Sequence, residues 1–339
     1  MADVADIVAA AQPLIAAARR APPREAVLLT GGRNNRVIKL VFDEEPPLVL
    51  KSYFHDPNDP RDRLGAEFAF LETVWEYGVR NVPQPLGCDR DRHLGLYSFV
   101  PGEKIAPGQL NADHVQAALD FVLAINRQSP DLTGLKPASE ACFSIESHMQ
   151  TVAARVARLD RLDETVPLAA AAGELIETSL KPLWHQVAAE VGRALETGRV
   201  ADSVSGKIVS PSDFGFHNAL AGRDGVTFID FEYAGIDDPA KLVCDFFCQP
   251  DIPVDIRFLD HFVSVMSQSL SLNEGFLERT NLLLSAYRIK WVCIMLNEFA
   301  DIGSRRRLFA GGQEKREARC RLQIEKASRS LSALRETLR

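Results

Sequence analysis

The chain has 339 residues, of which 46% are hydrophobic and 25% are charged, so it can bury a sizeable core as one large or two modest domains. Its net charge of -7 argues against a nucleic-acid partner, because domains that bind the phosphate backbone usually present a basic surface. No window approaches the roughly 18 uninterrupted apolar residues of a membrane span, so we expect none.

The first fifty residues predict a helix followed by strands. An alanine-rich segment with helical periodicity covers 4–20, and we expect a capping helix there rather than a targeting sequence. Strand patterns follow at 27–30, 36–42 and 48–53, with turn-forming residues between the first two, as in a hairpin. These strands predict a small antiparallel sheet.

Further along, an apolar stripe predicts a helix at 64–77, and prolines at 83 and 85 then break the chain. Another strand is predicted at 94–100. The pattern is mainly helical from 112 onward, with strand-like runs at 208–210 and 226–231.

We therefore predict an α+β fold with two lobes. The N-terminal lobe, 1–101, would hold the small antiparallel sheet. The C-terminal lobe, 102–339, would be larger and mostly helical.

The most informative stretch is 210–220, followed by 228–235. Asp213 and Asn218 are five residues apart, the interval between the base and the metal-binding asparagine of the kinase catalytic loop. Asp230 ends an apolar strand, where a carboxylate is costly unless it meets a cation. An amide oxygen and a carboxylate suit Mg²⁺, and Asp213 would orient the attacking hydroxyl and accept its proton.

The N-terminal lobe supplies further parts of a nucleotide site. Lys51 closes the third strand, as the phosphate-pairing lysine of kinases does, and Glu67 lies early on the next helix, where it could pair with Lys51. Gly31 and Gly32 lie in the hairpin turn, where backbone N–H groups can approach phosphates. No GxxxxGK[ST] occurs, so this is not a P-loop.

The order of these features resembles the aminoglycoside phosphotransferase and choline kinase family over roughly the whole chain. The resemblance rests on the Gly-Gly turn, Lys51, Glu67, the LYSFVPG segment at 96–102, the Asp213-to-Asn218 spacing and the IDFEYAG segment at 229–235. It implies a protein-kinase-like two-lobed fold, with ATP or GTP between the lobes, Mg²⁺, and a small-molecule acceptor held by the larger lobe. The lobe 1–101 would then bind the nucleotide, and the lobe 102–339 would carry the catalytic loop and the acceptor-binding helices.

The resemblance also assigns roles by position. Asp213 matches the catalytic base, and Asn218 and Asp230 match the magnesium ligands. Lys51 with Glu67 matches the pair that positions the nucleotide. The strand at 96–100 would be the interlobe hinge that meets the base, with Tyr97 and Phe99 as its nucleotide-binding residues; Gly31 and Gly32 complete that set.

One departure from the family pattern concerns the start of the catalytic loop. Family members typically have His-Gly before the aspartate, whereas this chain has Pro211 and Ser212. The family's histidine usually braces the loop rather than carrying a proton, so activity can survive its absence. His217, beside Asn218, could supply a compensating hydrogen bond.

Carboxylates after the metal strand have two interpretations. Glu232, Asp237 and Asp238 could face the acceptor or a second metal, yet Asp237 and Asp238 precede Pro239 as an N-cap would. Asp245 resembles the family's late helical aspartate, which often braces the catalytic loop by hydrogen bonding, so we expect Asp245 to give structural support.

Two functions from different classes follow. The first is a small-molecule kinase, dependent on Mg²⁺, that transfers the terminal phosphoryl group of ATP or GTP to a hydroxyl. The second, motivated by Pro211 and Ser212, is a catalytically silent, kinase-like nucleotide-binding module with a sensing or scaffolding role. The acceptor stays open among an aminoglycoside, choline, a sugar, a nucleoside and a glycan.

Two properties of the whole protein are expected as well. Six cysteines without CxxC pairs suit the reducing cytoplasm. We expect a monomer or a homodimer.

Overall fold

The computed structural model describes residues 3–29, 35–55, 59–300 and 313–338. Its internal contacts divide the chain into two compact units, each made of two stretches. Unit 1 comprises Met1–Ala141 and Ile208–Asp237, and unit 2 comprises Cys142–Lys207 and Asp238–Arg339. This division cuts the chain at places other than the predicted lobe boundary after 101, which stays a prediction.

Unit 1 contains the predicted antiparallel sheet, which is confirmed and has five strands in the described residues. They are β1 (Glu25–Leu29), β2 (Arg36–Val41), β3 (Leu48–Ser52), β4 (Pro85–Asp89) and β5 (Leu94–Ser98), in the spatial order β1-β2-β3-β5-β4. In the register, Lys51 on the central strand β3 lies opposite Val37 on β2 and Gly95 on β5. Lys51 is therefore held from both sides.

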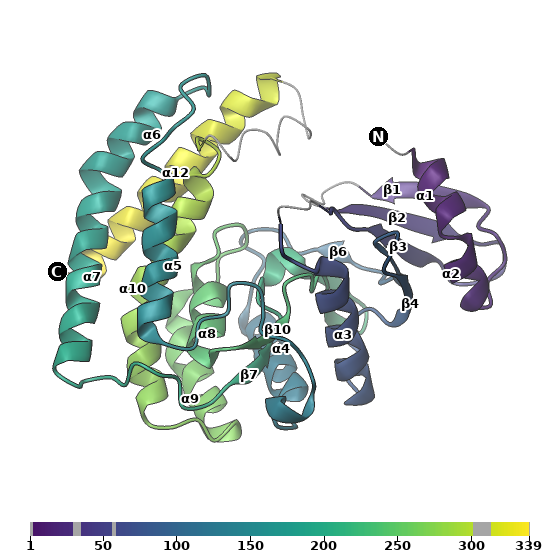
Figure 1. Cartoon of the computed structure of the whole chain (residues 1–339), viewed down its shortest axis with the longest axis horizontal. Helices are drawn as coiled ribbons and strands as arrows, with labels where there is room; N and C mark the ends of the chain where they lie inside the picture. The colour runs from purple at the N-terminus through teal and green to yellow at the C-terminus, as the bar shows by residue number, and fades with distance from the viewer. Residues whose placement is uncertain (1–2, 30–34, 56–58, 301–312, 339) are drawn as a thin grey trace. The chain divides into compact units, whose positions relative to one another are not determined.

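One face of the sheet packs against α1 (Val4–Ala10) and α2 (Gln12–Ala17), which lie across it in Figure 1. Side chains of these helices and alternate residues of the strands form a buried apolar cluster: Ile7, Ala11, Ile15, Ile38, Leu40, Phe42, Leu48, Leu50, Leu94 and Leu96. The segment predicted as one helix is thus two, because Pro13 in the first turn of α2 lacks a backbone N–H.

The opposite face of the sheet receives α3 (Arg63–Glu76). Asp62 caps this helix by accepting a hydrogen bond from the Gly65 N–H at 2.9 Å. The ring of Phe68 on α3 lies 6.2 Å from that of Tyr97 on β5, and Glu67 on the same helix is 1% exposed. The alternation of the strands therefore places Lys51 and Tyr97 on the face that α3 covers.

The strand β4 was missed by the sequence analysis, which treated Pro85 as a chain break. Proline cannot donate to a ladder, but it is tolerated as the first residue of an edge strand. Here Pro85 begins β4 at the sheet edge, next to a register shift between Pro85 and Gly87.

The rest of unit 1 contains α4 (Ala112–Ile125) and short strands. These are β6 (Glu103–Lys104), β7 (Ile208–Ser210), β8 (Ala219–Gly222), β9 (Gly225–Phe228) and β10 (Gly235–Asp237), with the 3-10 turns η1 (Pro130–Leu132) and η3 (Phe216–Asn218). β6, β8 and β9 form one sheet, and β7 pairs with β10. Stacked rings connect these parts: Phe121 on α4 lies 4.7 Å from Phe228, and Phe70 on α3 lies 4.6 Å from Phe231.

Unit 2 is helical. Its elements are α5 (Ile145–Arg158), α6 (Ala169–Leu175), the π-turn η2 (Ile176–Leu180), α7 (Lys181–Glu196), α8 (Pro239–Cys248), η4 (Ile256–Phe258), α9 (Leu259–Ser269), α10 (Gly275–Leu296) and α12 (Gln313–Thr337). α10 packs against α5, α7, α8 and α12, and these neighbours run beside it in Figure 1. Among the described helices, none has the length and apolar character needed to cross a bilayer.

A buried carboxylate at the start of α8 joins three helices of unit 2. Asp238 accepts the Ala240 N–H at 2.8 Å, which confirms the N-cap interpretation. Its Oδ2 also lies 3.1 Å from Nε2 of His148 on α5 and accepts from Nε of Arg279 on α10 at 2.8 Å. Asp245 lies further along α8 and accepts from Lys290 and Trp291 on α10, at 2.8 and 2.9 Å, so its structural support goes to α10 rather than to the predicted catalytic loop.

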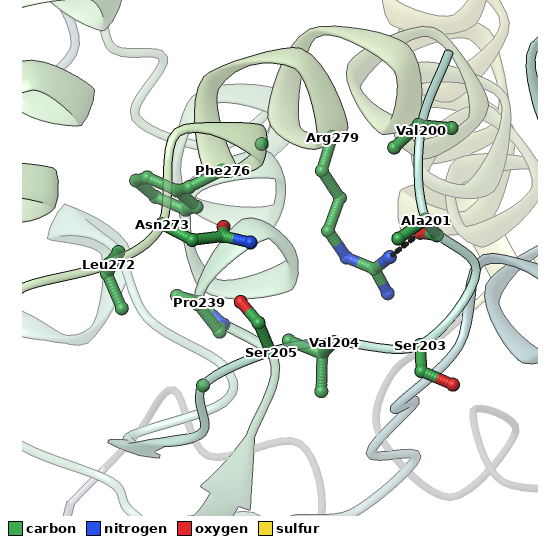
Figure 2. A pocket seen from close by; sticks show the side chains of 12 residues that line it. Val200, Ala201, Ser203, Val204, Ser205, Pro239, Leu272, Asn273, Phe276 and Arg279 are labelled. Atoms are coloured by element: carbon green, nitrogen blue, oxygen red, sulfur yellow. Dashed lines mark hydrogen bonds between the residues drawn. The ribbon is translucent and has the colours of Figure 1, made fainter. Parts of the chain in front are cut away.

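Figure 2 shows Arg279 beside a small pocket between the 200–206 segment and the start of α10. Its Nη1 donates to the carbonyl oxygens of Ala201 at 3.1 Å and Asp202 at 2.8 Å, and its other two nitrogens face Asp238. The guanidinium is therefore engaged by the protein rather than open to an anion.

Candidate active site

The site forms around the ammonium group of Lys51. Its Nζ lies 2.7 Å from Oε1 of Glu67 on α3 and 3.0 Å from Oδ1 of Asp230, which follows β9. The three residues belong to unit 1, although 179 positions separate Lys51 from Asp230. The structure thus brings together three of the residues predicted from the sequence.

Burial differs strongly among these three side chains. Lys51 and Glu67 are 11% and 1% exposed, whereas Asp230 is 41% exposed. Burial alone lowers the pKa of Lys51, but the negative charges of Asp230 and Glu67 outweigh it and raise the pKa above its ordinary value. The ammonium therefore stays charged, and Asp230 is the carboxylate of this group that a ligand can reach.

Two tyrosines complete the buried side of this cluster. The Tyr53 hydroxyl donates to Oε2 of Glu67 at 2.7 Å and lies 2.8 Å from the Tyr97 hydroxyl. Burial is the main cause that raises the Tyr97 pKa well above its ordinary value, so both phenols stay neutral. A Cβ on Gly95 would lie 2.6 Å from the Tyr97 hydroxyl oxygen, so only glycine leaves room for this ring.

The predicted hinge residues are placed differently from each other. The side chain of Tyr97 is buried and turned toward Tyr53, so only its backbone is suited to the predicted contact with a nucleotide base. Phe99 follows β5, and its ring lies 4.2 Å from Nζ of Lys39. Its N–H donates to the Pro47 carbonyl at 3.3 Å. The nucleotide-binding roles of both residues stay predictions.

The predicted catalytic loop is held by its own backbone and by Asn218. Nδ2 of Asn218 donates to the carbonyl oxygen of Asp213 at 3.0 Å, and the Asn218 N–H donates to the Gly215 carbonyl at 3.0 Å. Ser212 has a φ of 65°, in the left-handed region that favours glycine. This conformation gives a physical reason why the resembling family has glycine at that position.

Asp213 presents a partly exposed carboxylate from this loop. Its side chain is 38% exposed, and Oδ1 lies 3.2 Å from Nε2 of His217. The contact that the sequence suggested for His217 is thus made to the predicted base itself. Asp213 is accessible enough to meet a substrate.

Asn218 and Asp230 lie near each other because their strands pair. Ala219 on β8 is opposite Phe228 on β9, and the Ile229 N–H donates to the Asn218 carbonyl at 2.9 Å. Since Nδ2 of Asn218 is used by Asp213, the amide oxygen is left for another partner, and Asp230 offers a second oxygen donor. Oxygen donors of this kind fit a hard cation such as Mg²⁺.

No group of three or more His, Cys, Asp and Glu residues in the described ranges is arranged to hold a metal. A cation here would therefore need oxygens beyond those of Asn218 and Asp230. Phosphate groups commonly supply such ligands to Mg²⁺.

A second buried network lies two residues beyond Asp230. Glu232 is 5% exposed and accepts from Nδ2 of Asn35 at 2.5 Å. Nε of Arg63, on the first turn of α3, lies 3.7 Å from the same carboxylate oxygen, and Nη2 of Arg63 donates to Asp59 at 2.7 Å. Burial opposes ionisation of Asp59, but hydrogen bonds from Arg61 and Arg63 hold its pKa well below its usual range. The structure turns Glu232 toward protein partners.

A model of the phosphotransferase enzyme family matches residues 25–248, which is more than half of the chain. The chain belongs to this family. No curated protein sequence matches it significantly. The matched residues include the five polar side chains placed above: Lys51, Glu67, Asp213, Asn218 and Asp230.

Solved structures agree with this phosphotransferase assignment at the level of the fold. A choline kinase from Cryptosporidium parvum Iowa II is 14% identical, with 99% of this chain and 97% of that chain covered and a TM-score of 0.58. A spectinomycin phosphotransferase in complex with ADP and spectinomycin is 11% identical, with 90% and 92% covered and a TM-score of 0.58. An amicoumacin kinase in complex with AMP-PNP and Ca²⁺ is 14% identical, with 90% and 88% covered and a TM-score of 0.51. The predicted kinase-like fold is confirmed.

Several residues of the candidate site in this phosphotransferase-family chain could not be chosen from the sequence. No motif includes Asn35, Tyr53 or Arg63. Only their nearness in sequence to an expected site residue could have drawn attention to them. The predicted phosphate-binding glycines, Gly31 and Gly32, lie outside the described residues.

Proposed function

We propose that this chain is a small-molecule kinase that transfers the γ-phosphoryl group of ATP or GTP to a hydroxyl with the help of Mg²⁺. The observation that carries the proposal is the position of Lys51, whose Nζ contacts both Glu67 and Asp230 in the unit that also holds Asp213 and Asn218. Family membership supports phosphotransfer as the reaction class.

Asp213 is the proposed base. In the transfer, an oxygen of the acceptor hydroxyl forms a bond to the γ-phosphorus, and the bond from that phosphorus to the β,γ-bridging oxygen breaks. The nucleoside diphosphate leaves with the bond's electron pair, and the hydroxyl proton passes to a carboxylate oxygen of Asp213. This role needs an exposed, oriented carboxylate more than a strong base. The 38% exposure of the Asp213 side chain suits that role.

Asn218 and Asp230 are the proposed holders of Mg²⁺, through the amide oxygen and the accessible carboxylate. When bound, the cation would neutralise charge on the phosphate oxygens. One carboxylate oxygen of Asp230 contacts Lys51, so the same carboxylate would hold the cation close to the ammonium group.

Lys51 is the proposed phosphate-positioning group, and Glu67 fixes its direction. Two hydrogen bonds, of 2.7 and 3.0 Å, run from Nζ to Glu67, and the buried Tyr53 hydroxyl holds the far oxygen of Glu67. The ammonium is thereby preorganised, which costs less on binding than ordering a free lysine. Gly31, Gly32, Tyr97 and Phe99 are the other proposed nucleotide-binding residues.

The acceptor is proposed to be a small molecule that carries a hydroxyl. Structures of similar fold are named as a choline kinase, a spectinomycin phosphotransferase and a macrolide 2'-phosphotransferase, which act on different small molecules. A shared fold does not select one acceptor, because specificity lies in the pocket. We also propose a cytoplasmic location and a monomer or homodimer.

The alternative is a nucleotide-binding module without turnover. It is favoured by one observation, that Pro211 replaces the histidine with which the family's catalytic loop typically begins. The intact set of Lys51, Asp213, Asn218 and Asp230 favours the kinase, because a binding module has no use for its base.

The test measures nucleotide binding and transfer separately. Thermal shift with MgATP and MgGTP reports binding, and phosphate transfer is then screened against aminoglycosides, choline, sugars and nucleosides. We expect stabilisation that requires Mg²⁺, and transfer to one acceptor class. Asp213→Asn should keep the thermal shift and lower transfer by about 100-fold or more. The exposed Lys136→Met serves as a control that should change neither readout.

Each alternative outcome has a meaning. Stabilisation by MgATP with no transfer and no phosphate release would support the silent module. No stabilisation by either nucleotide would remove the proposed nucleotide site.

A further inference from the structure

The contact between His217 and Asp213 is local and specific. His217 lies on the 3-10 turn η3, four residues after Asp213, and its Nε2 is 3.2 Å from Oδ1 of that carboxylate. The turn is fixed by the hydrogen bond from the Asn218 N–H to the Gly215 carbonyl. The ring is therefore carried by the same short loop as the carboxylate it contacts.

Within the described residues, His217 is the one side chain at hydrogen-bonding distance from the Asp213 carboxylate. The other bonds of Asp213 use its backbone: its N–H donates to the Pro211 carbonyl, and its carbonyl accepts from Asn218. Without His217, rotation of this 38% exposed carboxylate would be unrestrained by any of these bonds.

The His217 ring is less accessible than the carboxylate. Its side chain is 18% exposed, and Nδ1 is buried with no hydrogen-bond partner in the described part of the chain. A buried Nδ1 cannot reach a substrate, so the polar function of the ring is the contact through Nε2. Because an ionised carboxylate only accepts hydrogen bonds, Nε2 carries the proton in this contact.

We infer that His217 is a positioning residue for the base. Its Nε2–H donates to Oδ1 of Asp213 and fixes the carboxylate, so that Oδ2 is directed to the acceptor hydroxyl. Pro211, at the start of the same loop, has neither a backbone N–H nor a polar side chain to offer. This role rests on the proposed phosphotransfer and adds to it the means by which the base is oriented.

The variants separate the hydrogen bond from the volume of the ring. His217→Leu removes the donor and keeps a bulky side chain, whereas His217→Gln keeps an amide N–H at a similar reach. His114→Leu is the control with the same substitution, since the His114 ring lies 6.2 Å from that of Phe216 between centroids, and Nδ1 of His114 accepts the Asn111 N–H at the start of α4 rather than contacting Asp213.

The readout is γ-phosphate release from MgATP to water by the full chain, which needs no identified acceptor. We expect His217→Leu to lower kcat by about 10- to 100-fold, because misplacing a reacting group by about 1 Å costs that much, with the KM for MgATP unchanged within about threefold. His217→Gln should recover most of the rate, and His114→Leu should keep it.

A double-mutant cycle tests whether His217 affects the rate through Asp213. In the Asp213→Asn background, His217→Leu should cause no further loss of rate, because the group it positions is already gone. An equal loss in both backgrounds, or a His217→Gln variant that folds but is as slow as His217→Leu, would overturn the positioning role.

Failure of the phosphotransfer proposal looks different. If the wild-type chain releases no phosphate and transfers none, both that proposal and the role of His217 are overturned. If the wild type turns over and His217→Leu has a normal kcat, only the role of His217 is lost.

Discussion

The single positive charge of Lys51 pairs with two carboxylates, those of Glu67 and Asp230. Glu67 is buried and Asp230 is exposed, so the ammonium links a protected ion pair to a ligand-accessible one. The stability of the fold and the geometry of the site therefore depend on the same side chain. A change at Lys51 will affect both properties, and the two effects need separate measurements.

We expect Lys51→Met to lower the free energy of unfolding by about 3–5 kcal/mol, because it leaves the Glu67 carboxylate buried without a cation. The double variant Lys51→Met/Glu67→Gln should recover a large part of this loss, since a neutral amide replaces the charge. Urea denaturation measures both. A double variant as unstable as the single one would show that packing, not charge, carries the effect.

Ser212 has an unfavourable backbone conformation in the predicted catalytic loop. Its φ of 65° is unfavourable for a side chain with a Cβ, by about 1–2 kcal/mol. Its hydroxyl also donates to the Ser139 carbonyl at 3.4 Å. The backbone cost and the side-chain contact have to be measured apart.

Comparing Ser212→Ala with Ser212→Gly separates these terms, because both remove the hydroxyl and only glycine relieves the backbone. We expect Ser212→Gly to be more stable than Ser212→Ala by about 1 kcal/mol in thermal or urea unfolding. Equal stabilities would mean that the left-handed conformation at this position costs nothing.

At the scale of elements, α3 is attached to the 230–232 segment at two points one helical turn apart. Glu67 reaches Asp230 through Lys51, and Arg63 faces Glu232 directly at 3.7 Å. Residues four apart lie on one face of a helix, so both contacts come from the same side of α3. Movement of this helix would disturb both at once.

We expect Arg63→Ala to lower the free energy of unfolding by about 3 kcal/mol, because Asp59 and Glu232 both lose a buried cation. Arg90→Ala is a control of the same type, since its pair with Asp62 is exposed on both sides and should contribute less than about 0.5 kcal/mol. Chemical denaturation of the two variants side by side tests the difference; similar losses would contradict it.

In unit 2, α5, α8 and α10 meet at Asp238 through His148 and Arg279. Burial lowers the pKa of His148, but the hydrogen bonds and negative charges of Asp238 and Cys142 together outweigh burial, so the net pKa is raised above 6.5. Protonation of His148 therefore adds stability that is complete below a pH of about 6.5 and is lost as the pH rises through the raised pKa.

The stability difference between the wild type and His148→Gln should accordingly be larger at about pH 5.5 than at about pH 9. Urea denaturation at a series of pH values gives this difference directly. A difference that stays constant, or grows with pH, would show that the ring is not held in its charged form.

At the scale of the whole molecule, local patterns predicted the elements that have strong local signals. The alternation in 36–42 predicted β2, the apolar start of 48–53 after two prolines predicted β3, and the helical stripe at 64–77 predicted α3. The Asp213-to-Asn218 spacing predicted the loop. β4 was missed because the sequence analysis interpreted Pro85, which begins this edge strand, as a break in the chain. β6, β8 and β10 are too short for a periodic signal.

The contacts of the candidate site were less predictable than its residues. The Glu232–Asn35 hydrogen bond spans 197 positions, and nothing about Asn35 in the sequence predicts it. The sequence predicted that His217 would make a hydrogen bond in this loop, because residues four apart in a tight loop can meet. It did not predict that the partner would be Asp213. Tertiary packing determines which side chains contact each other, whereas local sequence patterns determine the helices and strands.

The discontinuity of unit 1 has a consequence for biosynthesis. The ribosome delivers residues 1–141 first, so β3 and α3 can form and Lys51 can pair with Glu67 early. Asp213 and Asp230 emerge only after the 142–207 stretch of unit 2 has been made. A nascent chain stalled before residue 208 would therefore carry an ammonium group that lacks one of its two carboxylates, and the site would come into existence only in the last third of translation.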